Sequence, residues 1–295
     1  MTISGAIDTP PAWVQRRLDT LELRYDSASR SLWMCYRAEG SPFFSKSVLD
    51  EITWVRDSLI ADHLGPGGGA GRFRYLVMAS RQPGVFNLGG DLATFARAIR
   101  EGDRKTLLTY AHQCVELVYG LSTGFGLPMV TVAVVEGRAF GGGLEAALAE
   151  DYLIAAPDAQ MSAPEVAFNS FPGMGAVSML SRRLGAAAAE QIISSGRIYS
   201  GREMYELGVA DVLAEGDASA FASAWLADGG EARFQRRLAL ARARRKLFPI
   251  SLEELVRVTE LWVECSCQVT PADLRHMDRL VSAQKRFCGP HTLAG

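Results

Sequence analysis

One segment constrains the fold of this chain more than any other: a β-branched strand that leads through glycines into a helix. Residues 128–135 read Pro-Met-Val-Thr-Val-Ala-Val-Val, which is the composition of a buried strand. A triple glycine at residues 141–143 follows, and residues 144–150 read as a helix. Strand-to-helix units of this kind favour an α/β fold with crossover connections.

The same alternation of strands and helices continues over much of the chain. Residues 73–79 and 151–155 read as strands, whereas residues 91–99 and 105–119 have the apolar spacing of helices. Residues 21–37 alternate between apolar and polar side chains, which predicts a hairpin of two strands. The sequence therefore predicts an α/β core.

Three segments are expected along the chain. Residues 1–20 contain two adjacent prolines and are predicted to form a loose N-terminal arm. Residues 21–215 are predicted to form the α/β core, with a helix at residues 48–64 and a flexible glycine-rich linker at residues 65–71. Residues 216–295 read almost entirely as helix, which predicts a helical C-terminal module.

The composition excludes several classes of protein. Apolar residues make up 48% and charged residues 22% of the 295 residues, as in ordinary folded proteins. The net charge of −2 argues against a general nucleic-acid binder. The N-terminus has no signal-peptide pattern, and the longest apolar stretch falls short of the about 20 residues that a membrane span needs. Five scattered cysteines indicate free thiols, so we expect a cytoplasmic protein without membrane contact.

Three apparent motifs do not fit their context. Residues 120–124 match Gly-x-Ser-x-Gly, but a predicted helix precedes them, so we expect a helix-to-strand turn instead of a nucleophile elbow. Residues 141–146 match a loose dinucleotide fingerprint, yet Glu145 would place negative charge beside a pyrophosphate. The four histidines show no paired spacing, so no metal site is expected.

Seven basic residues crowd one predicted helix, and two interpretations of them remain open. One is a solvated helix face, with Leu238 and Leu247 on its inner side. The other is a landing patch for a phosphorylated or acidic acyl carrier. The basic residues are Arg233, Arg236, Arg237, Arg242, Arg244, Arg245 and Lys246.

Two glycine-containing turns carry the candidate chemistry. Residues 86–91 (Phe-Asn-Leu-Gly-Gly-Asp) and residues 136–145 each follow a predicted strand and enter a predicted helix. Glycines at such turns admit a ligand close to the backbone and expose N–H groups. If the two turns lie side by side, the N–H groups of Gly90 and Gly142 can bind one carbonyl oxygen as an oxyanion hole.

Two glutamates accompany these turns. Glu145 lies in the first helical turn after the triple glycine, and Glu165 follows Pro164 among apolar residues. Each alone is also explained as a helix cap or a charge that complements the helix dipole. Together with the glycine turns, a pair of catalytic carboxylates facing an oxyanion hole is the better interpretation.

These residues resemble the crotonase (enoyl-CoA hydratase/isomerase) superfamily, in order and spacing, from about residue 73 to residue 215. Within it the chain is most similar to the diffusible-signal-factor synthases, which make cis-2-unsaturated fatty acid signals. That likeness rests on residues 86–92, on residues 171–176 (Phe-Pro-Gly-Met-Gly-Ala), and on residues 259–263 and 277–280. The resemblance implies a spiral of ββα units with a helical C-terminal module.

The resemblance also implies a mechanism on a 3-hydroxyacyl thioester. Glu165 would remove the C2 proton, Glu145 would protonate the departing hydroxyl, and the N–H groups of Gly90 and Gly142 would hold the enolate oxygen. A second step would hydrolyse the cis-2-enoyl thioester to the free acid. No metal or redox cofactor is implied. The alternative is an ordinary enoyl-CoA hydratase or isomerase that acts on acyl-CoA.

The resemblance further suggests an acyl pocket and partners. Met174, Trp262 and Leu280 are candidates to line the acyl chain, although ordinary core packing explains each of them equally well. Ala163 departs from the bulkier residue expected before Pro164, which puts the preferred chain length in doubt. The expected partners are an acyl carrier protein or CoA thioester, a sensor's receiver domain as a further candidate, and other copies in a trimer or pair of trimers.

Overall fold

The computed structural model describes residues 9–65 and 71–287. The predicted linker at residues 65–71 and the first residues of the predicted arm fall mostly outside this described part. Of the five cysteines, the four that are described (Cys35, Cys114, Cys265 and Cys267) are free thiols, and Cys288 lies outside it. Within the described residues, none of the helices has the length and hydrophobicity of a membrane span.

A six-stranded sheet forms the centre of the described molecule. Its strand order is β1-β2-β3-β5-β7-β10, with β1 antiparallel to β2 and every other neighbouring pair parallel. The predicted hairpin is therefore present, at the sheet edge. The strands are β1 Leu21–Asp26, β2 Ser31–Tyr36, β3 Tyr75–Ser80, β5 Val130–Val135, β7 Tyr152–Ala155 and β10 Val212–Leu213.

A second, four-stranded sheet has the order β4-β6-β8-β9 in the described chain. Its strands are β4 Val85–Asn87, β6 Arg138–Phe140, β8 Gln160–Ser162 and β9 Tyr199–Ser200. Successive strands alternate between the two sheets: β3, β5 and β7 belong to the first, and β4, β6 and β8 to the second. This alternation is the spiral of ββα units that the family resemblance implied.

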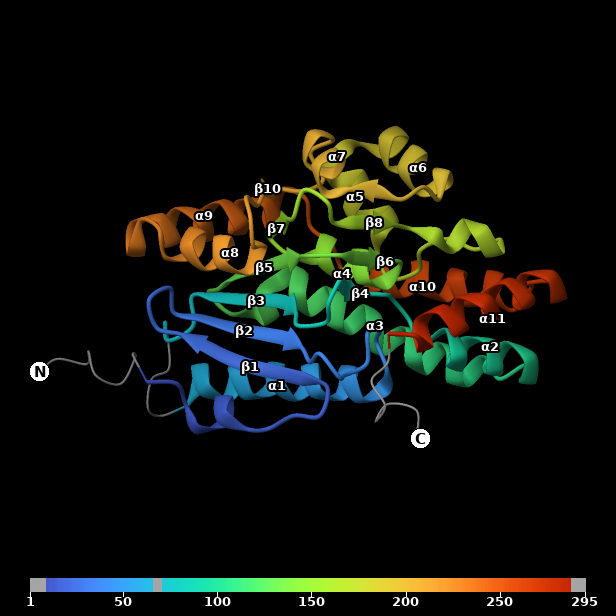
Figure 1. The fold of residues 1–295 in the computed structure, drawn as a ribbon, viewed down its shortest axis with the longest axis horizontal. Helices are drawn as coiled ribbons and strands as arrows, with labels where there is room; N and C mark the ends of the chain where they lie inside the picture. The colour runs from blue at the N-terminus through green and yellow to red at the C-terminus, as the bar shows by residue number, and fades with distance from the viewer. Residues whose placement is uncertain (1–8, 66–70, 288–295) are drawn as a thin grey trace, which may run out of the picture.

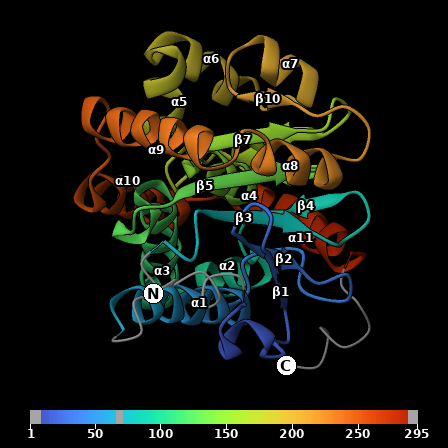
Figure 2. The ribbon, with the colours of Figure 1, turned by 90° about the vertical axis from the view of Figure 1, so that its left-hand side faces the viewer.

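Helices enclose the sheets on several sides (Figure 1). α8 and α9 contact β5, and Figure 2 shows them lying across one face of the main sheet. α10 contacts α3, while α11 contacts α2, so the last two helices cover the end of the molecule where α2 and α3 lie. The helices are α1 Lys46–Leu64, α2 Leu92–Glu101, α3 Arg104–Thr123, α4 Gly142–Ala149, α5 Ala176–Leu184, α6 Ala186–Ser195, α7 Gly201–Glu206, α8 Ala218–Ala227, α9 Gly230–Leu247, α10 Leu252–Ser266 and α11 Pro271–Lys285, and the 3₁₀ helices are η2 Ala12–Gln15, η3 Gly124–Gly126 and η4 Pro164–Phe168.

The N-terminal segment differs from the loose arm expected for residues 1–20. Residues 12–15 form the short helix η2, and Val14 and Leu18 are buried. Trp13 packs its ring against Trp54 of α1 and against Phe73. Aromatic burial therefore fixes the described part of this segment to the core, despite its two prolines.

In helix α9, Leu247 and Arg237 differ from the interpretation of a solvated helix face. Leu238 is buried as expected, but Leu247 is 73% exposed. Arg237 is buried instead: its guanidinium lies 3.4 Å from the centre of the Trp225 ring and donates to the hydroxyl of Tyr75. Long arginine stems cover apolar surface while their charged heads find partners, so charge alone did not identify the outer face.

The Gly-x-Ser-x-Gly segment forms the last turn of α3 and its cap, so it leads from a helix to a strand and is no nucleophile elbow. α3 ends at Thr123, and Gly124 caps it in the left-handed conformation with φ 61°. The next strand, β5, begins at Val130. Ser122 donates to the carbonyl oxygen of Tyr119, as a helical serine commonly does.

Candidate active site

All the predicted site residues line one narrow cavity of about 70 Å³. They come from elements far apart in the chain: the turn before α2, the start of α4, η4, the loop before α5, α10 and α11. These residues are Gly90, Gly142, Glu145, Glu165, Met174, Trp262 and Leu280. The spiral thus gathers at a single place residues that the sequence connects only by pattern.

The first glycine turn lies directly against the second. Gly89 has φ 87°, a conformation that glycine adopts without steric cost. A Cβ at Gly89 would stand 2.8 Å from the carbonyl oxygen of Phe140 and 2.9 Å from the amide nitrogen of Gly142. Only a residue without a side chain permits this approach, so the glycine is required for the two turns to meet.

The second turn places Gly142 at the first position of α4. Gly141 has φ 52° and its carbonyl oxygen accepts the N–H of Glu145, which fixes the peptide plane carrying the Gly142 N–H. Within the described residues, neither Gly90 N–H nor Gly142 N–H has a hydrogen-bond acceptor. Two amides without acceptors therefore border one cavity, which is what an oxyanion hole requires.

Glu145 is buried in the first turn of α4. One of its carboxyl oxygens accepts the backbone N–H groups of Met174 and Ala176, at 2.8 and 2.9 Å. Burial raises the pKa of Glu145 well above that of an exposed carboxyl, while these hydrogen bonds oppose the shift because they stabilise the charged form.

Glu165 lies in η4 and faces the same cavity. Burial is the main cause that raises its pKa, and the charge of Glu145 raises it further. Its Oε2 atom has no hydrogen-bond partner among the described residues. The ionised form of Glu145 is therefore the better stabilised of the two, and Glu165 holds the proton when the pair carries one charge.

The remaining walls of the cavity are apolar. The ring of Trp262 lies 5.0 Å from that of Phe95, centre to centre, and packs against Gly173 so closely that a Cβ there would stand 2.4 Å from it. Met174 and Trp262 are largely buried. These contacts fit an acyl-chain wall and core packing alike.

Three polar residues near the turns were not foreseen. Asn87 is fully buried and accepts the N–H of Gly89 at 2.7 Å. The hydroxyl of Tyr110 accepts the N–H of Asp91 at 3.1 Å, and Gln284 of α11 donates to this turn. Only Asn87 belongs to a motif visible in the sequence, whereas the other two reach the turn through the fold.

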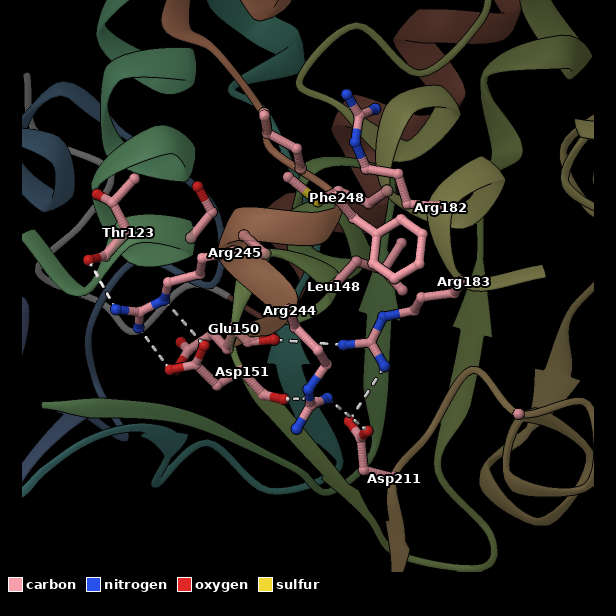
Figure 3. Close-up of a pocket in the computed structure, with 15 residues that line it drawn as sticks. Thr123, Leu148, Glu150, Asp151, Arg182, Arg183, Asp211, Arg244, Arg245 and Phe248 are labelled. Atoms are coloured by element: carbon pink, nitrogen blue, oxygen red, sulfur yellow. Dashed lines mark hydrogen bonds and ion pairs between the residues drawn. The ribbon is translucent and has the colours of Figure 1, made fainter. Parts of the chain in front are cut away.

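A larger cavity, of about 340 Å³, lies where α3, α4, α5 and α9 end (Figure 3). Its arginines are paired: Arg183 and Arg244 both contact Asp211, and Arg245 contacts Asp151 at 2.6 Å. Figure 3 shows the contacts of Arg183 and Arg244 with Asp211, and of Arg245 with Asp151, as dashed lines. Because the charges satisfy each other, the cluster ties α9 to the sheet and offers no unpaired cation to a ligand.

Residues 9–65 and 71–287 contain no group of three or more histidine, cysteine, aspartate or glutamate side chains placed to hold an ion. The two glutamates of the cavity are buried carboxyls in an apolar setting. The arrangement suits proton transfer beside a stabilised oxyanion.

The family of the chain is decided by a match to a family model. Residues 70–227, more than half of the chain, match the model for enoyl-CoA hydratase/isomerase. The chain belongs to the enoyl-CoA hydratase/isomerase family. The predicted superfamily is thereby confirmed, and the matched range includes both glycine turns and both glutamates.

Other members of the enoyl-CoA hydratase/isomerase family are similar over most of this chain. Human mitochondrial methylglutaconyl-CoA hydratase is 27% identical over 262 residues, which cover 85% of this chain and 70% of that protein. Mouse mitochondrial enoyl-CoA hydratase domain-containing protein 2 is 30% identical over 212 residues, which cover 72% of this chain and 64% of that protein.

Solved structures of this family share the fold. Enoyl-CoA hydratase from Bacillus halodurans superposes with a TM-score of 0.69 at 18% identity, covering 90% of this chain and 100% of the other. Human mitochondrial delta3-delta2-enoyl-CoA isomerase gives 0.67 at 18% identity, covering 91% and 99%. At such identities the likeness establishes the crotonase fold and leaves the substrate open.

Proposed function

We propose that this protein adds water to, and removes water from, the C2–C3 bond of an acyl thioester. The observation that carries the proposal is the unequal environment of the two buried glutamates beside two unpaired amides. Glu145 accepts two backbone N–H groups and is the ionised partner, whereas Glu165 has a carboxyl oxygen without any partner and is the protonated one. A reaction that needs one base and one acid is matched by this pair.

In the hydration direction, the Glu145 carboxylate takes a proton from water as the oxygen bonds to C3. The C2–C3 π electrons move toward the thioester, and the N–H groups of Gly90 and Gly142 hold the resulting enolate oxygen. Glu165 then gives its proton to C2. Dehydration is the reverse, with Glu165 as the base and Glu145 as the acid, and neither direction draws on a metal or redox cofactor.

The protonation state of the free site favours starting with an enoyl thioester. Glu145 accepts two backbone N–H groups and Glu165 has an oxygen without a partner, so with one charge on the pair the site is in the state from which hydration begins. Dehydration begins after the proton has moved from Glu165 to Glu145. The same enzyme can catalyse hydration and dehydration, and the concentrations of the enoyl and 3-hydroxyacyl thioesters decide the net direction of the reaction.

Glu145→Gln and Glu165→Gln are the variants that test the proposal. Loss of a positioned acid or base costs about 10²–10⁴-fold, so each variant should lose at least about 100-fold in kcat on 2-enoyl-CoA and 3-hydroxyacyl-CoA. The disappearance of the conjugated enoyl thioester is followed by its ultraviolet absorbance, with circular dichroism as the check of folding. Full turnover by both variants would exclude the proposed chemistry.

A second candidate is hydrolysis of the thioester, which would release a free cis-2-unsaturated acid as the diffusible-signal-factor synthases do. In that step one glutamate takes a proton from water as the water oxygen bonds to the thioester carbonyl carbon, and the charge settles on the carbonyl oxygen in the oxyanion hole. The C–S bond then breaks, and the carrier thiol departs with that proton, returned by the glutamate. What supports considering it is that Met174, Trp262 and Leu280, the acyl-pocket residues suggested by that resemblance, all line the cavity.

One assay separates the two candidates and also the two carriers. The protein is given 3-hydroxyacyl carrier protein and 3-hydroxyacyl-CoA separately, and the products are analysed by mass spectrometry. Release of free cis-2-enoic acid supports the synthase, whereas reversible hydration without acid supports the hydratase. Arg236, Arg242 and Lys246 are the basic residues of α9 that face solvent and could receive an acidic carrier.

A further inference from the structure

The C-terminal helix α11 reaches into the first glycine turn with one side chain. Gln284 is 6% exposed, and its amide nitrogen donates to the carbonyl oxygens of Leu88, at 3.2 Å, and Gly90, at 2.9 Å. These two carbonyls belong to the peptide planes on either side of the plane that carries the Gly90 N–H. A single amide group therefore holds both neighbours of the plane that supplies the first oxyanion donor.

The central peptide plane, which joins Gly89 to Gly90, is held at its carbonyl oxygen. The carbonyl oxygen of Gly89 accepts the N–H of Phe44 at 2.8 Å. In a trans peptide the N–H points opposite to the carbonyl, so the Gly90 N–H points away from Phe44. The two outer peptide planes have hydrogen bonds at both their carbonyl oxygen and their N–H. Of the polar backbone groups in these three described planes, only the Gly90 N–H therefore has no partner.

We propose that Gln284 is a positioning residue that aligns the Gly90 N–H for the thioester oxygen; this rests on the proposed function. Without Gln284, the Leu88 and Gly90 carbonyls lose their donor and the turn can rotate about the φ and ψ angles of two consecutive glycines. An oxyanion donor acts only when it is held at the right place before the reaction, so added freedom lowers the rate without unfolding the protein.

A second contact connects α11 with the acid of the site. Asn169 ends η4, the helix that carries Glu165, and its side-chain amide donates to Asp273 of α11 at 2.9 Å. Helix α11 therefore contacts the first glycine turn through Gln284, near the end of α11, and η4 through Asp273, near the start of α11. The side chains that α11 contributes to these contacts, Gln284 and Asp273, lie beyond residue 227, where the match to the family model ends.

The test replaces Gln284 by methionine, which keeps the length and approximate volume of the side chain and removes the donor. We expect kcat to fall by about 10- to 100-fold with KM nearly unchanged, less than the 10²–10³-fold cost of losing an oxyanion donor outright. Amide hydrogen exchange of a peptide covering residues 86–95 should become faster. The matched control is Asp278→Asn, on the same helix, which removes an exposed ion pair with Arg100 and should alter neither quantity.

The outcomes separate this proposal from the proposed function. If the wild-type protein turns over acyl thioesters and Gln284→Met retains its kcat, the positioning role is excluded. The same holds if exchange over residues 86–95 does not change, whatever the activity. If exchange becomes faster but the wild-type protein converts no acyl thioester, the proposed function is the part that fails. A common loss of melting temperature in both variants, with unchanged kcat, would mean that α11 only stabilises the fold.

Discussion

At the residue scale, the protonation of the glutamate pair should set the pH dependence of the reaction. Burial raises the pKa of both carboxyls above the ordinary value of 4.5, and the charge of Glu145 adds to the shift at Glu165. The working state has one proton on the pair. Activity should therefore fall toward acid, where both are protonated, and toward alkali, where both are ionised.

The profile of kcat/KM against pH checks this expectation. This profile should be bell-shaped, and the apparent pKa values of its acidic and alkaline limbs should both lie above 4.5, the ordinary carboxyl value. In Glu145→Gln the charge that raises the pKa of Glu165 is absent, so the remaining carboxyl should titrate at lower pH than in the wild type. An acidic limb at the value of an exposed carboxyl would contradict the burial of the pair.

At the scale of elements, the contact between the two glycine turns should be sensitive to a single methyl group. Gly89→Ala places a Cβ within 3 Å of two backbone atoms, the carbonyl oxygen of Phe140 and the amide nitrogen of Gly142, and forces alanine into φ 87°. Both oxyanion donors would move. We expect kcat to fall by at least about 100-fold, since each donor is worth 10²–10³.

Gly102→Ala is the matched control for this prediction. Gly102 also has a positive φ, 64°, but it caps α2 in open space, with nothing within 4 Å of an added Cβ. Its cost is backbone strain alone, about 1–2 kcal/mol of stability, with kcat unchanged. Steady-state kinetics and thermal melting of both variants give the comparison. Equal kinetics for the two variants would show that the turns do not need their close contact.

The local elements around these turns could be predicted from sequence, whereas their support could not. The strand β5, the glycines and the start of α4 are adjacent in the chain, so composition and spacing specify them. Gln284 and Tyr110 meet the first turn only through tertiary packing, which no local pattern encodes. Arg237 was misplaced for a related reason: periodicity assigns charge to the surface, and here the guanidinium is buried against Trp225.

At the scale of the whole molecule, one buried carboxyl lowers the stability of the fold without serving the site. Glu150 follows α4 and is 2% exposed, and neither of its carboxyl oxygens has a hydrogen-bond partner among the described residues. Burial, with the neighbouring charge of Asp151, raises its pKa well above the ordinary value. Its raised pKa means that the folded state holds a proton which the unfolded state releases.

The sign of the resulting pH dependence follows from linkage. When the folded pKa exceeds the unfolded one, the folded state binds more protons between the two values, so the free energy of unfolding falls as the pH rises through that range. Glu150→Met removes the carboxyl at similar volume. The variant should gain about 1–3 kcal/mol, the cost of an unsatisfied buried polar group, at neutral pH, and less near pH 4.5.

Thermal melting from acid to neutral pH tests this prediction, with Asp151→Asn as the contrasting variant. Asp151 is paired with Arg245 at 2.6 Å and accepts the N–H of Thr131, so its replacement should lower the melting temperature where that of Glu150 raises it. Turnover should be retained in Glu150→Met, because the side chain lies outside the cavity of the glutamate pair. A lower melting temperature for Glu150→Met at neutral pH would contradict the prediction that the unpartnered carboxyl destabilises the fold.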